Sequence, residues 1–390
     1  MIYLDNGATT FVHHRVKEKL IDIIDNHIGN PSSLHQLGLD AEKKIKEARF
    51  EVAKLFKGKE KNIIFTSGGS ESNNLAIKGV LGTYGNRGNH IIISSIEHAS
   101  IFHQVKKLEK NGVEVSYLSV DDKGFVDNEE LKKLIRKDTL LVSIMHVNNE
   151  IGTVQKLEEI GKIIKEKNSN TIFHIDAVAS FGKLPIEFIK WNADIISVSG
   201  HKIHAPKGVG ALFIKDNLKL NSLIDGGSQE WGMRAGTENV AGIVALGEAC
   251  KIINEESVEK YLPQVEKINN YLRKRIIDEI SDSRINGSEC RNGEIFISSP
   301  YVVNLGFKGV KAETLLHHLA SNKVYVSTTS ACSSKESKEN SRILSEIKVP
   351  KAYMEGSIRV TFNKYTTIDE IDEFIKILKD GIEMLRMFRR

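Results

Sequence analysis

The segments TIFHIDAVAS, residues 171–180, and DIISVSGHK, residues 194–202, decide the fold of this chain. Each contains a nearly unbroken run of apolar, mostly β-branched residues that gives way to small and polar residues. A continuous rather than alternating run is typical of a strand buried on both faces, as in a parallel sheet covered by helices. The two segments therefore predict strands of such a sheet, each followed by a polar turn.

The same pattern extends outward from these segments over residues 60–215. Short apolar runs alternate there with longer amphipathic ones, which is the order of elements in a βα fold. Further strands are predicted at residues 63–65, 91–93, 113–118, 140–147 and 209–214, with helices such as 128–136, capped by Asp127, and 157–167 between them. We therefore expect an α/β fold with a mainly parallel seven-stranded sheet.

The residues that follow this block predict a second, smaller α+β domain. It contains a long helix over residues 255–280, strands at 302–307, 324–327 and 357–362, and helices at 313–320 and 368–387. The amino-terminal segment is expected to pack against it, and an amphipathic helix over residues 40–56 precedes the sheet. We therefore expect a large domain over residues 15–255 and a small domain over residues 1–14 and 256–390.

Charge and hydropathy exclude several classes of function. The 390 residues include 55 Lys and Arg and 51 Asp and Glu, a formal charge of +4, and the basic clusters at 57–61 and 386–390 are short. Nothing resembles a nucleic-acid footprint, and no run approaches the roughly 18 apolar residues that span a bilayer. Residues 1–10 are too short and polar for a secretory signal. We expect a cytoplasmic protein that contacts neither nucleic acid nor a membrane directly.

The three cysteines are odd in number and lack the spacing of a zinc site. A disulfide framework is therefore not expected, whereas a single reactive thiol is possible. Cys250 lies in an apolar stretch, which predicts packing, and Cys290 lies in the polar sequence GSECRNG, which predicts a surface turn. Cys332 begins a long polar segment, an unusual place for a cysteine that only packs.

Three features near strand ends could carry chemistry. The sequence FTSGGSESNN at residues 65–74 is a strand, a glycine turn and a helix start, whose free N–H groups suit a phosphate, although any βα unit has this form. Lys202 follows a strand directly and can form a Schiff base, although most lysines are only solvated. Asp176 ends a strand, where aspartates also cap helices or pair with a base.

Together these features match what pyridoxal phosphate needs from a protein. The lysine holds the aldehyde, the aspartate pairs with the pyridinium nitrogen, and the helix start holds the phosphate. His98, just past another strand, could cover the cofactor ring, although a lone histidine is more often structural. This combination is far more specific than any of its members.

Along nearly its whole length the chain resembles the cysteine desulfurases, pyridoxal-phosphate enzymes of fold type I in the class V aminotransferase group. The motifs that carry the resemblance are YLDNGATT at 3–10, MHVNNEIG at 145–152, RAGTEN at 234–239, SACSS at 330–334 and SIRV at 357–360. The Ser-Ala-Cys sequence looks like that of the long-loop subgroup, whose loop carries a nucleophilic cysteine. A cysteine desulfurase takes sulfur from L-cysteine and releases L-alanine.

The resemblance implies a role for each matching residue. Lys202 would attach the cofactor, Asp176 would pair with its ring nitrogen, and His98 would stack on the ring and move protons. The phosphate would be bound by Gly69, Ser70, Ser199 and His201, and by Thr237 from the second subunit of a homodimer. Asn149 would contact cofactor or substrate, and Arg359 would pair with the substrate carboxylate.

Cys332 would be the nucleophile of the reaction. It would attack the substrate sulfur and keep it as a persulfide, which needs the thiol to be activated because a free cysteine has a pKa of about 8.5. The persulfide would pass to a protein acceptor, an iron–sulfur scaffold or a tRNA thiolation enzyme. Cys332 could also ligate an iron–sulfur cluster transiently together with a partner.

Several positions depart from the family pattern. Ala179 stands where the family usually has a Gln that bonds the cofactor's ring oxygen, which would cost about 1 kcal/mol if water substitutes. Thr329, Ser228 and Ala205 stand where Gly is common. These changes leave every covalent participant in place, but they raise the possibility of a specialised or slow paralogue.

Two other readings remain open at this level. One is a different pyridoxal-phosphate enzyme, an aminotransferase or a selenocysteine lyase, which would give Cys332 no role. The other is a weakly active scaffold for sulfur-carrier partners, suggested by Ala179 and Thr329. Retention of Lys202 and Asp176 argues against the scaffold.

Overall fold

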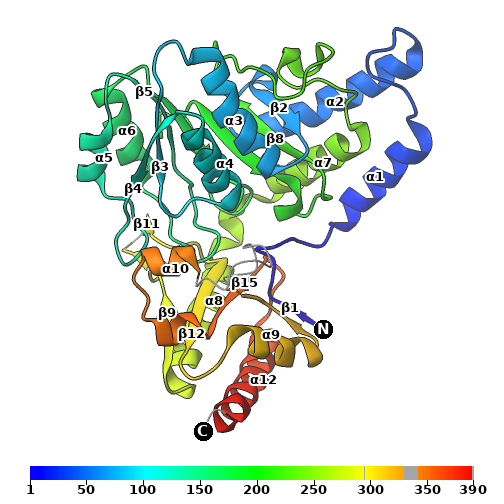
Figure 1. Cartoon of the computed structure of the whole chain (residues 1–390). Coiled ribbons are helices and arrows are strands. Elements are labelled where there is room, and N and C mark those ends of the chain that lie inside the picture. The colour runs from blue at the N-terminus through cyan, green and yellow to red at the C-terminus, as the bar shows by residue number, and fades with distance from the viewer. Residues whose placement is uncertain (294, 329–340, 389–390) are drawn as a thin grey trace.

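The computed structural model describes residues 1–293, 295–328 and 341–388. Figure 1 shows a large α/β lobe and a smaller lobe below it, with the amino-terminal residues beside the smaller lobe.

The large lobe is built on a seven-stranded sheet of order β2-β8-β7-β6-β5-β3-β4. Its strands are β2 (Ile63–Thr66), β3 (His90–Ser94), β4 (Glu114–Leu118), β5 (Thr139–Ser143), β6 (Ile172–Asp176), β7 (Ile195–Ser199) and β8 (Gly210–Ile214). Only β8, among these strands, runs antiparallel to its neighbours, β2 and β7. The predicted mainly parallel sheet is therefore confirmed, and its continuous apolar strands are buried on both faces except at the edge strand β4.

Helices cover both faces of this sheet and form a separate core on each. One face packs against α3 (Gly69–Tyr84) and α4 (Ala99–Lys110). The other packs against α2 (Gln36–Leu55), α5 (Asn128–Leu134), α6 (Leu157–Lys167) and α7 (Val240–Glu256), with α1 (His14–Asn26) lying along α7. Asp127 caps α5 as predicted, because its side chain accepts the N–H groups of Glu129 and Glu130.

The small lobe contains a four-stranded antiparallel sheet of order β14-β15-β12-β9. Its strands are β9 (Ser283–Asn286), β12 (Val302–Phe307), β14 (Ser327–Thr328) and β15 (Ser357–Thr361), and its larger helices are α8 (Leu262–Glu279), α9 (Ala312–Ser321) and α12 (Ile368–Met387). Shorter elements are β1 (Ile2–Tyr3), β10 (Arg291–Asn292), β11 (Ile295–Phe296), β13 (Val324–Tyr325), α10 (Arg342–Glu346) and α11 (Lys351–Met354).

The amino terminus joins the small lobe. Strand β1 pairs with β13, and Leu4 lies in the core of the small lobe, whereas Val16 lies in a core of the large one. These separate cores support the division into residues 15–255 and residues 1–14 with 256–390, which stays a prediction.

Three predictions of local structure were wrong. The helix expected over 255–280 is two helices. Helix α7 ends at Glu256, Ser257 turns the chain at φ 60°, and α8 begins at Leu262 with Pro263 in its first turn. The strand expected at 324–327 is divided between β13 and β14, which belong to different sheets. Cys290 is only 2% exposed, because its carbonyl accepts the N–H groups of Ile297 and Ser298 and folds its turn inward. Cys250 is buried as predicted.

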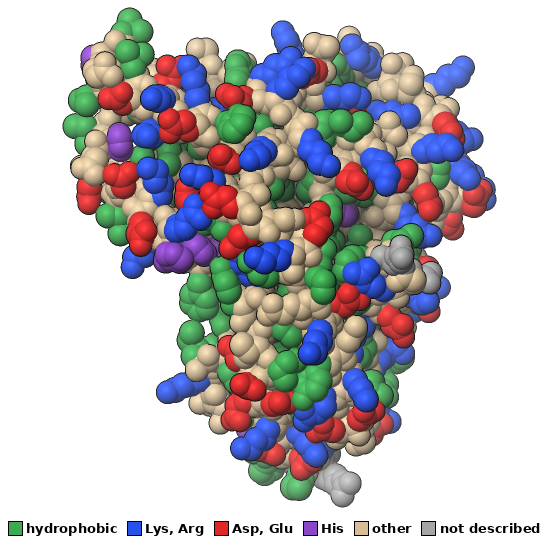
Figure 2. Space-filling model, turned by 180° about the vertical axis from the view of Figure 1, so that it is seen from behind, with side chains coloured by type: hydrophobic (Ala, Val, Ile, Leu, Met, Phe, Trp, Pro, Cys, Tyr) green, Lys and Arg blue, Asp and Glu red, His purple; other side chains and the backbone are tan. Residues whose placement is uncertain are grey.

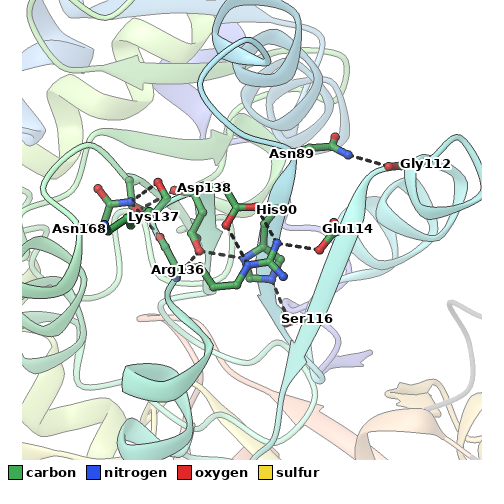
Figure 3. Close-up of polar contacts among 11 residues, drawn as sticks. Asn89, His90, Gly112, Glu114, Ser116, Arg136, Lys137, Asp138 and Asn168 are labelled. Carbon is green, nitrogen blue, oxygen red and sulfur yellow. Dashed lines mark hydrogen bonds and ion pairs between the residues drawn. The ribbon is translucent and has the colours of Figure 1, made fainter.

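A polar network closes the amino-terminal edge of the sheet (Figure 3). His90 of β3 bonds Thr139 of β5 through Nδ1 at 2.8 Å and Ser116 of β4 through Nε2 at 2.9 Å. Arg136 bridges Glu114 at 2.7 Å and Asp138 at 2.8 Å beside it. The two clusters tie three strands together at the end away from their carboxyl termini.

Within the described ranges, no helix has the length and apolar character needed to cross a membrane.

Candidate active site

A cavity of about 470 Å³ lies where the carboxyl ends of the parallel strands meet the small lobe. Polar side chains gather at this edge because each strand of a parallel sheet ends there. The structure brings all but two of the predicted site residues to its wall: Gly69, Ser70, His98, Asn149, Asp176, Ser199, His201, Lys202 and Arg359. The exceptions are Thr237, which is exposed outside this cavity, and Cys332, which lies outside the described residues.

One end of the cavity is suited to a phosphate. Gly68, at φ 149°, turns the chain from β2 into α3, and a Cβ on Gly69 would lie 2.6 Å from Val178 Cγ2, so only glycine fits this wall. Ser199 Oγ and His201 Nδ1 are buried there without a hydrogen-bond partner among the described residues. Burial and the neighbouring Lys202 lower the pKa of His201 to about 4. A helix start with two unsatisfied polar atoms beside it fits a bound phosphate.

Asp176 is held as a fixed carboxylate at the end of β6. Its Oδ2 accepts a hydrogen bond from Asn73 Nδ2 at 2.8 Å, and its Oδ1 accepts the Val178 N–H at 2.9 Å. Sequence reasoning missed Asn73, although its place four residues after Gly69 on α3 puts it one helical turn behind the phosphate end. A buried, oriented carboxylate fits the ring nitrogen of a pyridinium.

His98 caps α4 and lies beside Asp176. Its Nδ1 accepts the Ser100 N–H at 3.2 Å and lies 2.8 Å from Ser100 Oγ. Burial lowers the pKa of His98, Asp176 opposes this effect, and Lys202 adds to it. The lowered pKa favours the neutral ring, and because Nδ1 accepts a backbone N–H, the proton of the neutral ring is assigned to Nε2.

Lys202 reaches from the turn after β7 toward the amino-terminal segment. Its Nζ donates to the carbonyl oxygens of Gly7 and, at 3.0 Å, Ala8. The motif that carries these residues therefore forms part of the site, a role that sequence reasoning did not assign to it.

Arg359 of β15 presents its guanidinium to the cavity from the small lobe. Its Nη2 lies 3.2 Å from Asp5 Oδ1, and its Nη1 donates to the Asn149 carbonyl at 3.1 Å. Arg359 Nε and Asn149 Oδ1 are buried without a partner among the described residues. Asp5, which also accepts from Ser327 Oγ at 2.7 Å, was missed by sequence reasoning. The Arg359 guanidinium is therefore held by Asp5 and the Asn149 carbonyl, and its Nε remains as a donor for a ligand carboxylate.

The segments next to residues 329–340 are attached to the cavity. Thr328 lines its wall. On the other side, Ser341 donates to Glu150 Oε2 at 3.0 Å, and Arg342 donates to the carbonyl oxygens of Ser95 and Glu97. Burial raises the pKa of Glu150 to about 7. The described residues on both sides of Cys332 thus lie at the site.

The segment that carries Thr237 is anchored to the large lobe by two ion pairs. Glu230 forms a buried pair with Arg49, with both N···O distances at 2.7 Å. Arg234 Nε lies 3.0 Å from Glu71 Oε1, and Glu71 Oε2 accepts the Ser67 N–H at 2.7 Å. The exposed Thr237 is therefore presented by a segment fixed next to the phosphate end of α3.

Comparison with known proteins identifies relatives along almost the whole chain. The model of the family "Aminotransferase class-V" matches residues 2–374. A protein named cysteine desulfurase IscS from Dictyoglomus turgidum is 44% identical over 385 residues, which cover 99% of this chain and 95% of that protein. A protein of the same name from Methanosarcina thermophila is 40% identical over 388 residues, covering 99% and 93%.

Solved structures agree with these relatives. A NifS-like protein superposes with a TM-score of 0.91 at 36% identity, covering 98% of this chain and 99% of that one. SspA, solved in complex with cysteine, superposes with a TM-score of 0.81 at 34% identity, covering 94% and 100%.

Proposed function

This chain belongs to the class-V aminotransferase family and is a cysteine desulfurase, and on that premise we propose which of its residues carry the reaction. Members of this family are pyridoxal-phosphate enzymes. We propose that pyridoxal phosphate occupies the cavity between the lobes. The observation that carries this proposal is the meeting of Lys202, the fixed carboxylate of Asp176, and the unpaired Ser199 Oγ and His201 Nδ1 in one cavity.

In this proposal each part of the cofactor would have a described residue to hold it. Lys202 would hold it covalently, Asp176 would pair with the ring nitrogen, and the start of α3 with Ser199 and His201 would hold the phosphate. Bound pyridoxal phosphate would supply an electron sink for the bonds next to the substrate's amine. His98 would lie against the ring, with Nε2 left to move protons because Nδ1 is bonded to Ser100.

Arg359 would orient the substrate. Its guanidinium would bind the carboxylate of L-cysteine in a two-pronged contact, assisted by Asn149, whose Oδ1 faces no described partner. Asp5 and the Asn149 carbonyl already fix the plane of the fork, so little side-chain freedom is lost when substrate binds.

Cys332 would take the sulfur. Its thiolate would attack the sulfur of the bound substrate, so that an S–S bond forms as the C–S bond breaks and the electron pair stays with the carbon skeleton, which takes up protons to become L-alanine. Thr328, which lines the cavity, and Ser341, which bonds Glu150 of the cavity wall, support this role. The persulfide would then pass to a protein acceptor, an iron–sulfur scaffold or a tRNA thiolation enzyme. Transient ligation of an iron–sulfur cluster by Cys332 is a lesser proposal.

The working enzyme would be a homodimer in the cytoplasm. Thr237 is exposed outside the cavity of its own chain, which fits a role in the partner's phosphate site. Exposed apolar side chains gather on and around α1 and the start of α2, where a second copy could cover them (Figure 2): Ile21, Ile24, Ile28, Leu34 and Leu37. The free thiols of Cys250 and Cys290 fit a reducing compartment.

The test is to incubate the purified protein, loaded with pyridoxal phosphate, with L-cysteine and a reductant while alanine and sulfide are measured. We expect equal amounts of alanine and sulfide. Cys332→Ala should abolish both products but keep the visible absorbance of the bound cofactor. Lys202→Ala should lose that absorbance.

Two outcomes would contradict this assignment. Bound cofactor without alanine production, even with candidate acceptors present, would favour a scaffold or another pyridoxal reaction. Alanine production that survives Cys332→Ala would favour a lyase that does not use a loop thiol.

A further inference from the structure

Lys183 is a second lysine of the active-site cavity that the reaction described above does not use. It lies in the turn that follows β6, where its backbone N–H donates a hydrogen bond to the Ser180 carbonyl at 2.9 Å. This turn contributes Val178, Ala179 and Lys183 to the cavity wall. Since Val178 and Ala179 carry no polar side-chain atoms, Lys183 is the side chain through which this wall can bond a ligand.

The ammonium of Lys183 has no anionic neighbour in the described part of the chain. No hydrogen bond or ion pair joins it to a described residue, and it lies over the Tyr301 ring, with 5.9 Å from Nζ to the centroid. The titratable and charged groups that face it are Lys202, Arg359, His201 and His204. None of these can neutralise it.

These surroundings disfavour the charged form of Lys183. Burial, with Lys202 and Arg359 adding repulsion, lowers the pKa of Lys183 to about 7. Two other charged groups of the cavity already have polar partners. Arg359 forms an ion pair with Asp5, and Asp176 accepts a hydrogen bond from Asn73. Lys183 is half-buried. A partly desolvated cation without a counter-ion is stabilised when a ligand brings an anionic oxygen to it.

We propose that Lys183 is an anion-binding residue of this active site, whose ammonium contacts an oxyanion of the bound ligands at the wall where Ala179 offers no hydrogen bond. The proposal rests on the function proposed above. Two ligand oxygens carry the required chemistry, a ring oxygen of the cofactor and the carboxylate of the amino acid. In either case Lys183 is a positioning residue, and ligand binding should be accompanied by proton uptake near pH 7 to 8 as the ammonium gains its counter-ion.

The test compares Lys183→Met, which keeps the length and packing of the apolar stem, with Lys183→Arg, which keeps the cation. Apo-protein of each variant is titrated with pyridoxal phosphate, and the dissociation constant, the absorbance maximum and its pH dependence are recorded without substrate. The loaded proteins are then titrated with L-alanine, the amino-acid product, which carries the same carboxylate but no sulfur, and the KM and kcat for L-cysteine are measured separately.

Each source of the oxyanion predicts a different result. A cofactor oxygen predicts that Lys183→Met shifts the absorbance and its pH midpoint and weakens cofactor binding about tenfold. A substrate carboxylate predicts an unchanged spectrum and an about tenfold weaker affinity for L-alanine, with a matching rise in KM. Lys183→Arg should restore most of whichever property is lost.

The proposal is overturned if Lys183→Met folds with the wild-type melting temperature and changes neither the cofactor spectrum nor either affinity. If Lys183→Met does not fold, Lys183→Gln, which keeps polarity without charge, is measured in its place against Lys183→Arg. Failure of the proposed function gives a separate signature in the wild-type protein, which would then bind no cofactor, or bind it without producing alanine from L-cysteine.

Discussion

Asn73 is the residue on which the orientation of Asp176 depends. Its Nδ2 donates to the buried carboxylate at 2.8 Å and also lies 2.9 Å from Ser100 Oγ, which bonds His98. Asn73→Ala removes a hydrogen bond to a charged group, so we expect pyridoxal phosphate to bind about ten- to a hundredfold more weakly. Absorbance titration of the apo-protein measures this. Lys78→Ala, an exposed change on the same helix, is the control, and wild-type affinity in Asn73→Ala would refute the role.

Glu97 gives the protein a predictable dependence of stability on pH. Its carboxyl is fully buried, and Oε1 accepts Ser94 Oγ at 2.6 Å and the Met145 N–H at 2.8 Å. Burial raises the pKa of Glu97 to about 8, against these hydrogen bonds. Because the folded pKa lies above the unfolded one, the stability contributed by the protonated form is complete below pH 4.5 and is lost as pH rises to about 8.

Glu97→Gln cannot ionise and should therefore escape that loss. We expect its unfolding free energy to exceed that of the wild type by about 1–3 kcal/mol at pH 8.5, and by much less at pH 5.5. Thermal unfolding at the two pH values measures the difference. The exposed change Glu47→Gln should show no such trend, and a Glu97→Gln protein that is equally destabilised at both pH values would contradict the pKa argument.

At the scale of elements, contacts that stabilise the fold and residues of the candidate active site lie at opposite edges of the large sheet. The network of His90, Arg136, Glu114 and Asp138 closes the amino-terminal edge, whereas the cavity lies at the carboxyl edge. Because Arg136 is largely exposed, its ion pairs are worth little, and Arg136→Ala should lower the unfolding free energy by about 1 kcal/mol. Cofactor affinity should not change. Urea denaturation and absorbance titration check both statements, with the exposed Lys137→Ala as control; a loss of cofactor affinity would show that the two edges are coupled.

The elements show how much of the fold could be predicted from the sequence. The strands were predictable because a strand buried on both faces must be apolar throughout, as β6 and β7 are. Helix α7 was not predicted as such because it is apolar and small on nearly every side, so its sequence lacks the stripe that marks an amphipathic helix. Its end at Glu256 depends on the positive φ of Ser257, which no residue preference announces.

The site could be predicted where a residue type limits its possible chemistry, or where a motif resembles that of a known family. Lys202 and Asp176 stand at strand ends, and their residue types limit what they can do. Asn73, Asp5 and Lys183 became visible only in the structure, because their roles depend on which elements meet: α3 against β6, the amino-terminal segment against β15, and a turn against the small lobe. Contacts between elements that are distant in the sequence depend on tertiary packing, and a single sequence does not reveal that packing.

At the scale of the whole molecule, the position of Thr237 makes the dimer testable through catalysis. Its segment is fixed to the large lobe by the pairs Arg49–Glu230 and Arg234–Glu71, yet Thr237 itself is exposed and does not line the cavity of its own chain. If Thr237 completes the partner's site, then Lys202→Ala on one chain and Thr237→Ala on the other damage the same site of a mixed dimer. The site of the Lys202→Ala chain carries both defects, and the site of the Thr237→Ala chain carries neither.

The two variants are mixed under conditions that allow subunits to exchange. We therefore expect alanine production to rise toward the rate given by one native site per mixed dimer. Each variant alone is the control, and the mass of the mixture in solution shows that dimers are present. If Thr237 instead serves its own chain, every site of the mixed dimer keeps one defect and mixing restores nothing. Substituting Asp for Ile24 on α1 should weaken the dimer and remove the restoration as well, because a buried carboxylate in the apolar contact disfavours association.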